Sequence, residues 1–283
     1  MGCSFFNISK KSGVPKPHEE ILDTKIKKLQ EFYQREKALV TSPFISQDLV
    51  LNKELLSGVL QQLDFDVEGN VLDIGCGTGL LSTFFDAVDF YCGIDLNNHP
   101  GYQVLLDDKH RFLQGNALHL PFAAEQFDLA ICMDSFEHFP DPITAAKELY
   151  RVLKPQSSLF LSVPTYANVA GLVKKWAERY GGYEDNSWAP FDFWKPQELE
   201  HFITPARVKE IFSRAGFKRF DLIGFDKEVV VGLFPWIWHP RMPGKLAAAL
   251  SKSCNLFARP VVSMWPHSSL HTFWKLTKLD NTR

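Results

Sequence analysis

Long apolar runs are missing from this sequence, and none approaches the ~20 residues of a membrane-spanning helix. The N-terminus, MGCSFFNISKKSG, also has no apolar core of a secretory signal peptide, so we expect no export. An excess of one charge is missing too, because 31 Lys and Arg residues against 33 Asp and Glu residues give a net charge of −2. No overall positive field therefore favours nucleic acid as a partner.

Cysteine is sparse as well. The five cysteines are scattered along the chain, without a CxxC pair and without a His/Cys cluster at zinc spacing. The pattern therefore indicates neither a disulfide framework nor a zinc site. A reduced, cytoplasmic setting is the simplest interpretation, with attachment to a membrane surface as an open alternative.

What the chain does have is enough length for a substantial core, with 283 residues of which 45% are hydrophobic and 23% charged. An amphipathic helix is expected over Ile21–Val40 and a second helix over Asp48–Leu63. We expect residues 1–63 to form a helical lid segment over the carboxyl edge of a sheet, and residues 64–283 to form the main domain. The apolar positions that repeat along the first helix are Leu22, Ile26, Leu29 and Tyr33.

From Asn70 onward, strands and helices alternate, which predicts a mostly parallel sheet with helices on both faces. One helix begins at Asp141-Pro142 and another at Thr204-Pro205, each with an N-cap residue followed by a first-turn proline. Two insertions, residues 165–203 and 228–267, interrupt the pattern. The expected strands are Asn70–Ile74, Phe90–Asp95, Arg111–Gln114, Phe127–Met133, Ser158–Val163, Phe217–Phe225 and Leu270–Leu279.

The first strand leads directly into the glycine-rich segment GCGTG (residues 75–79), and apolar residues at helical spacing follow. This order binds adenine nucleotides and related ligands at the carboxyl ends of parallel strands. A pyrophosphate-binding loop needs G-x-G-x-x-G/A, whereas Leu80 occupies the last small position here. Asp73, inside the strand, would repel a phosphate but suits a cation such as an ammonium or a sulfonium. Asp95 ends the second strand, where a carboxylate can accept hydrogen bonds from both ribose hydroxyls.

These features, with the segments EQFDLAICMDSFEHFPDP and KELYRVLKP around Gln126–Pro155, resemble the class I S-adenosylmethionine-dependent methyltransferases, in the small-molecule, methyltransferase type 11-like branch. The resemblance covers roughly Asn70–Val163. It implies a Rossmann-like, seven-stranded, mostly parallel sheet sandwiched by helices, with lid insertions. It also implies S-adenosyl-L-methionine as cofactor and S-adenosyl-L-homocysteine as product. The residues that it implies for cofactor binding are Asp73, Gly75, Cys76, Gly77, Thr78, Gly79, Asp95, Leu96, Asn116, Ala117, Met133 and Asp134.

One of these positions departs from the family pattern. The family commonly has Asp where this chain has Asn116, and uses it to read the adenine amino group. The carbonyl oxygen of Asn116 can still accept a hydrogen bond from that group. The departure is therefore compatible with the same cofactor.

The resemblance also implies direct, in-line transfer of a methyl group from a sulfonium to an acceptor. Glu137 and His138 follow the fourth strand, so the fold brings them near the sulfonium. We expect His138 to act as a general base for an oxygen nucleophile or to orient the acceptor, with packing of the loop as its alternative role. A metal site on this pair has no obvious third ligand in the sequence.

The acceptor is expected to be a small molecule, with lipid-like and glycan-linked compounds both compatible. A non-catalytic S-adenosylmethionine-binding sensor or assembly protein, and a protein methyltransferase, are the alternative functions. The sequence leaves the oligomeric state open.

The two insertions are expected to select the acceptor. Tyr166, Trp176 and Trp188 of the first insertion, together with Tyr33, are candidates to line the acceptor pocket, or else to fill a small lid core. The apolar run Val229–Trp238 of the second insertion suits contact with a membrane surface or a lipid tail. Burial against the sheet or in a dimer interface is its alternative.

Overall fold

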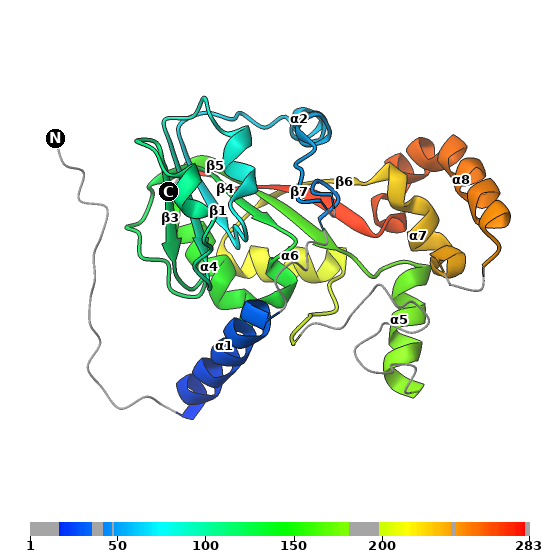
Figure 1. Cartoon of the computed structure of the whole chain (residues 1–283), viewed down its shortest axis with the longest axis horizontal. Coiled ribbons are helices and arrows are strands. Elements are labelled where there is room, and N and C mark those ends of the chain that lie inside the picture. The colour runs from blue at the N-terminus through cyan, green and yellow to red at the C-terminus, as the bar shows by residue number, and fades with distance from the viewer. Residues whose placement is uncertain (1–16, 36–41, 47, 181–197, 239–241, 281–283) are drawn as a thin grey trace.

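The computed structural model describes residues 17–35, 42–46, 48–180, 198–238 and 242–280. Their core is a seven-stranded sheet in the order β3-β2-β1-β4-β5-β7-β6 (Figure 1). The strands from β1 to β5 are parallel to their neighbours, whereas β7 is antiparallel to both β5 and β6. The strands are β1 (Asn70–Ile74), β2 (Phe90–Asp95), β3 (His110–Gln114), β4 (Phe127–Met133), β5 (Leu153–Pro164), β6 (Arg219–Gly224) and β7 (His271–Thr277).

Helices cover both faces of this sheet, as expected for a doubly wound α/β fold. The described helices are α1 (Pro17–Arg35), α2 (Lys53–Gln62), α3 (Tyr102–Leu105), α4 (Pro142–Val152), α5 (Val169–Tyr180), α6 (Pro205–Ala215), α7 (Val229–Leu233) and α8 (Gly244–Met264). Short 3₁₀ segments are η1 (Leu80–Phe84), η2 (Phe136–His138), η3 (Asp226–Glu228), η4 (Pro235–Trp238) and η5 (Pro266–Ser268).

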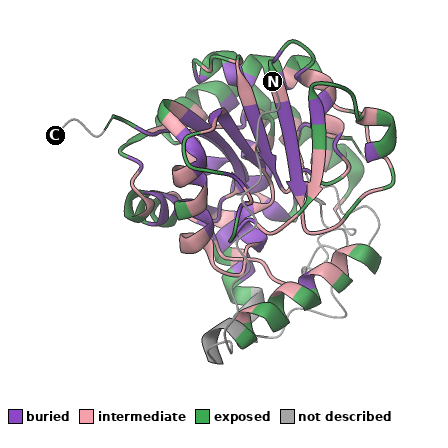
Figure 2. Ribbon diagram, turned by 90° about the vertical axis from the view of Figure 1, so that its left-hand side faces the viewer, coloured by how far each residue is buried: buried purple, intermediate pink, exposed green. Residues whose placement is uncertain are grey.

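The alternation of side chains along the strands divides the core into two layers. On one face, α4 and α6 pack against residues such as Leu72, Leu161 and Trp274. On the other face, α2 and η1 pack against the strand residues that alternate with these, among them Val71 and Phe160. The central strands are buried along most of their length, whereas the edge strands β3 and β6 are mostly half-buried (Figure 2). Because α2 belongs to this second layer, the parts of the N-terminal segment beside the carboxyl edge are α1 and the stretch that holds Ser42 and Ile45.

Local signals fix the ends of several elements as expected. The side chain of Asp141 accepts a hydrogen bond from the Thr144 backbone N–H at 3.1 Å, and that of Thr204 accepts one from Arg207 at 3.2 Å. Each is an N-cap that satisfies an otherwise free donor of the first helical turn. Gly216 ends α6 with φ +121°, a conformation that favours glycine.

The helix expected after the glycine loop is wrong in type. Residues Leu80–Phe84 form a single 3₁₀ segment, η1, instead of an α-helix. Only ten residues separate Gly79 from the start of β2 at Phe90. These ten residues hold η1 and the turns that lead back to β2.

The two insertions come together in a cap beyond the β7 and β6 side of the sheet (Figure 1). A separate small core joins Tyr166, Val230, Val231, Ile237 and Leu270. The run Val229–Trp238 therefore packs inward: Val231 is fully buried and Ile237 is 2% exposed, while Trp236 is 42% exposed. Of the two alternatives for this run, the structure shows burial. Within the described ranges, no helix has the length and apolar character to cross a membrane.

Candidate active site

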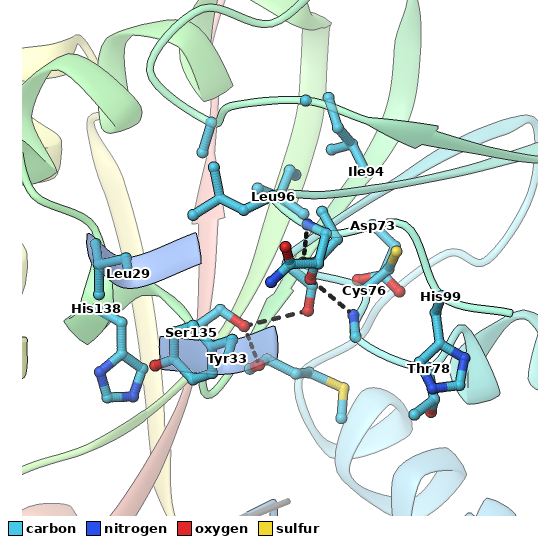
Figure 3. Close-up of a pocket in the computed structure, with 18 of the residues that line it drawn as sticks. Leu29, Tyr33, Asp73, Cys76, Thr78, Ile94, Leu96, His99, Ser135 and His138 are labelled. Carbon is cyan, nitrogen blue, oxygen red and sulfur yellow. Dashed lines mark hydrogen bonds between the residues drawn. The ribbon is translucent and has the colours of Figure 1, made fainter. Parts of the chain in front are cut away.

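A cavity of about 560 Å³ opens at the carboxyl ends of β1, β2 and β4. The glycine loop and the loop after β2 form one wall. Residues of α1, among them Leu29 and Tyr33, form the opposite wall, as the close-up shows (Figure 3). This is the crevice outside the strand ends in which open α/β sheets bind ligands.

Positive φ angles shape the glycine loop. Gly75 has φ +73°, and a Cβ atom there would lie 2.4 Å from Ser135 Oγ, so only glycine fits between the two strand ends. Gly77 has φ +53° and faces open space. At Gly77 the loop therefore presents its backbone to the cavity, with no side chain that would hold a ligand away.

Asp95 is fixed at the end of β2 by backbone donors. Gly77 N donates to Oδ2 and Asn97 N donates to Oδ1, each at 3.0 Å. Burial raises the pKa of Asp95, and these hydrogen bonds oppose the rise. Each carboxylate oxygen has two lone pairs, so both oxygens can still accept a hydroxyl donor from a ligand.

Asp73 is the most buried carboxylate of the loop, with 2% exposure. Tyr91 donates its hydroxyl hydrogen bond to Asp73 Oδ2. Burial raises the pKa of Asp73 to about 7, against the lowering effect of this hydrogen bond. A cation placed in the cavity would favour the charged form of this carboxylate.

The structure brings nearly all the expected cofactor residues to this one cavity. Asn116 uses Oδ1 to accept the Leu118 backbone N–H at 3.0 Å, which holds its side chain in place. Gly79 is the exception and does not line the cavity. It lies under Phe112, whose Cε1 would be 2.7 Å from a Cβ at this position. The expected residues that line the cavity are Asp73, Gly75, Cys76, Gly77, Thr78, Asp95, Leu96, Asn116, Ala117, Met133 and Asp134.

His138 lies in η2 and lines the same cavity. Its Nδ1 is 2.6 Å from the Leu199 carbonyl oxygen, so Nδ1 carries the proton that is donated there. Burial lowers the pKa of His138, which keeps the ring neutral and leaves Nε2 unprotonated. The ring packs edge-on to Tyr33 at a centroid distance of 6.2 Å.

Glu137, the second residue that we expect near the sulfonium, does not line the cavity. It is 2% exposed, and its Oε1 lies 3.6 Å from His138 Nε2. Burial and the nearby Asp134 raise the pKa of Glu137 well above its ordinary value. Of the two neighbours in η2, only His138 lines the cavity.

A charged network behind the cavity was missed by sequence reasoning. His271 of β7 has Nδ1 2.7 Å from Glu228 Oε2 and Nε2 3.7 Å from Asp134 Oδ1. Burial alone would lower the pKa of His271, but Glu228 and Asp134 raise it to about 9, so the ring is charged at neutral pH. Asp134 also accepts a hydrogen bond from Ser162 Oγ at 2.7 Å.

The candidate lid residues separate into two groups. Tyr33 lines the cavity, and α1 contributes Ile26 and Leu29 beside it. The helical stripe of α1 was the signal that could have identified these two residues as ligand contacts.

The aromatic residues of the first insertion lie elsewhere. Tyr166 is absent from the cavity wall because its ring stacks on Phe202 and its hydroxyl donates to Glu200, within the cap core. Trp176 lies on α5, 63% exposed and outside the cavity lining. Trp188 falls outside the described residues. Within the described part of the chain, no group of three or more His, Cys, Asp or Glu side chains is placed to hold a metal ion.

Comparison with known proteins agrees with this geometry. The family model described as "Methyltransferase domain" matches residues 50–220, more than half of the chain. The chain belongs to the class I S-adenosylmethionine-dependent methyltransferases.

Two curated relatives of this methyltransferase carry the name ubiquinone biosynthesis O-methyltransferase. The Histophilus somni enzyme is 31% identical over 199 residues, which cover 66% of this chain and 80% of that one. The Haemophilus ducreyi enzyme is 33% identical over 106 residues, covering 32% of this chain and 44% of that one. Among solved structures, the Burkholderia thailandensis 1,6-didemethyltoxoflavin-N1-methyltransferase has a TM-score of 0.53 at 16% identity and covers 96% of this chain and 94% of its own. This last similarity concerns the fold alone.

Proposed function

We propose that this small-molecule methyltransferase transfers its methyl group to an aromatic hydroxyl of a largely apolar acceptor. The observation that carries the proposal is that His138, whose Nδ1 donates its proton to the Leu199 carbonyl, lines the same cavity as the glycine loop and Asp95. S-adenosylmethionine supplies a methyl group on a cationic sulfur, and the acceptor oxygen displaces that sulfur in line.

The cofactor is held by the residues that surround the loop. The Asp95 carboxylate accepts hydrogen bonds from the ribose hydroxyls, in addition to those from Gly77 and Asn97. Asn116 meets the adenine edge. Asp73 attracts the cationic end of the cofactor, and the missing side chain at Gly77 lets the ligand approach the backbone closely. Fixed alignment of donor and acceptor can supply ~7–11 kcal/mol of the barrier.

The acceptor is an aromatic hydroxyl because of the base available to it. A neutral histidine, with an ordinary pKa of about 6.5, can remove the proton of a phenol of pKa about 10 as the methyl bond forms. An aliphatic hydroxyl is far less acidic and would need a stronger base. His138 keeps the tautomer that this step requires, because the Leu199 carbonyl holds the other ring proton.

The acceptor is apolar because of the wall opposite the glycine loop. Ile26, Leu29, Ile45 and Phe139 line this part of the cavity around His138 and Tyr33. Such a wall excludes water and suits a ring with an alkyl substituent. The two curated relatives named ubiquinone biosynthesis O-methyltransferase support the same class of acceptor.

The test is methyl transfer from labelled S-adenosylmethionine to an alkylcatechol, an alkylaniline of the same chain length and a sugar-linked phenol. We expect label in the ether of the alkylcatechol. The His138→Gln variant should lose about 100- to 10,000-fold in kcat. Its affinity for S-adenosylhomocysteine, measured by calorimetry, should stay unchanged.

His267→Gln is the matched control, because this side chain packs on Trp265 in the cap and does not line the cavity. It should keep wild-type turnover. Faster transfer to the aniline would contradict the oxygen acceptor, faster transfer to the sugar-linked phenol would contradict the apolar acceptor, and full turnover in His138→Gln would contradict the base.

A further inference from the structure

Helix α8 presents an apolar stripe to the outside, interrupted by Ser253. Leu246 is 50% exposed, Leu256 73%, Phe257 66% and Met264 83%. At 100° per residue these four positions fall within about 100° of the helix circumference, with Ala249, Ser253 and Pro260 between them. Exposed apolar side chains scattered singly are ordinary, but a stripe along a whole helix marks an interaction surface.

The adjacent face of α8 shows that this orientation is fixed by packing. Ala258 is 3% exposed, and Ala247, Leu250 and Cys254 pack against the cap core that contains Val230, Val231 and Ile237. The stripe therefore points away from the protein. In the view of Figure 1, α8 lies at the outer end of the molecule, on the opposite side from β3.

Charge along the helix has one sign only. Lys245, Lys252 and Arg259 are all exposed and follow at intervals of seven residues, so they form one row beside the apolar stripe. The sequence has no Asp or Glu between Glu228 and Asp280. Asp226 is the one carboxylate paired with this row among the described residues, 3.3 Å from Arg259 Nε, and Arg259 remains 90% exposed.

We propose that α8 docks the protein on the surface of an anionic lipid bilayer. The helix lies parallel to the surface, with Leu246, Leu256, Phe257 and Met264 in the boundary between headgroups and acyl chains, and with the row of basic side chains on lipid phosphates. No described helix has the character to cross the bilayer, so the contact is peripheral. A second copy of the chain fits this face poorly, because it would bring a second basic row toward the first.

This surface differs from the run Val229–Trp238, whose side chains form the cap core beneath α8. It is also independent of the proposed acceptor, because vesicle binding requires neither catalysis nor S-adenosylmethionine. The two proposals can therefore fail separately.

The experiment is co-sedimentation of the whole chain with phosphatidylcholine vesicles, with and without about one-third phosphatidylglycerol. We expect binding that depends on phosphatidylglycerol and weakens with salt. The double variant Lys252→Gln/Arg259→Gln should bind about 25-fold more weakly, since each charge is worth about fivefold. The double variant Leu256→Ser/Phe257→Ser should bind vesicles at least about tenfold more weakly, because it removes two apolar side chains that the bilayer would bury.

Matched controls lie elsewhere on the surface. Val104→Ser removes an 87% exposed apolar side chain from α3. Lys209→Gln/Lys218→Gln removes two exposed charges, one in α6 and one shortly after its end. Both should bind vesicles like the wild type, and all variants should keep affinity for S-adenosylhomocysteine, which reports the folded state. Equal binding to both kinds of vesicle, or equal losses in the controls, would overturn the proposal. So would the absence of vesicle binding, if the protein formed a dimer that Leu256→Ser/Phe257→Ser dissociates.

Discussion

Asp73 is a buried carboxylate with a pKa of about 7, so its charge at neutral pH depends on what lies beside it. A cationic ligand binds the ionised form better, and the ionised form disappears as the pH falls through 7. We therefore expect the affinity for S-adenosylmethionine to fall as the pH drops below 7, with a slope that approaches about tenfold per pH unit. Calorimetric titrations at several pH values on either side of 7 measure this.

The variant Asp73→Asn should bind more weakly at high pH and lose this dependence. Asp95→Asn is the comparison, because it removes a carboxylate from the same cavity while leaving Asp73 in place. An unchanged pH profile in Asp73→Asn would assign the dependence to another group.

For His271 we expect an effect at high pH, on the stability of the fold. Its pKa is about 9 in the folded protein and about 6.5 when unfolded, so folding favours the protonated ring. The contribution is fully present below pH 6.5 and is lost as the pH rises through 9. It amounts to about 3 kcal/mol of the free energy of unfolding. Urea unfolding across this range should show a steeper decline in the wild type than in His271→Gln.

The comparison between the two proteins is what isolates His271. Buried tyrosines and cysteines, such as Tyr91 and Cys132, also have raised pKa values and reduce stability at high pH in both proteins. Parallel declines in wild type and variant would show that the Glu228–His271 pair contributes nothing that depends on pH.

Helix α7 depends on a close approach to the turn at η5. A Cβ at Gly232 would lie 2.0 Å from the Ser268 carbonyl oxygen. Alanine normally stabilises a helix interior over glycine by ~0.5–1 kcal/mol, but here the backbone would have to move. We expect Gly232→Ala to lower the free energy of unfolding by about 1–3 kcal/mol in urea titrations.

Helix α2 supplies the matched control for this prediction. Gly58 is exposed, and a Cβ there would meet nothing within 4 Å. Gly58→Ala should therefore raise the free energy of unfolding by ~0.5–1 kcal/mol. The same sign for both variants would mean that α7 and η5 pack less tightly than described.

Elements with complete local signals were predictable from the sequence. The bounds of β4 (Phe127–Met133) agree with the expectation, and α4 begins at Pro142 directly after its Asp141 cap. Helix α8 was not predicted, although it has 21 residues. Its apolar residues lie on two adjacent faces, one buried and one exposed, and Pro260 interrupts the pattern. Such a helix does not show the single apolar stripe by which periodicity identifies helices.

The site was predictable to the extent that its residues come from consecutive strand ends. The glycine loop, Asp95 and Asn116 follow β1, β2 and β3, so the fold class alone brings them together. The network of Asp134, Glu228 and His271 could not be inferred, because it depends on where the insertion and β7 return to the sheet. No local sequence pattern shows where these two segments meet the sheet.

At the scale of the whole molecule, the two insertions pack together into one cap. Residues from the first, such as Tyr166, and from the second, such as Val231, share one cap core with Leu270 just before β7. The cap is therefore anchored to the strand that carries His271. Through His271, Glu228 of the second insertion is connected to Asp134, which lines the cavity.

The position of β7 between β5 and β6 also sets an order of events during synthesis. β6 pairs with β7 alone, and the outer edge of β5 has no other partner in the sheet. On the ribosome, the five parallel strands emerge first and can associate, while β5 waits with an open edge. Open edges recruit other chains. The newly made protein is therefore most exposed to aggregation just before residues 271–277 leave the exit tunnel, and a chaperone that shields a strand edge would act at that moment.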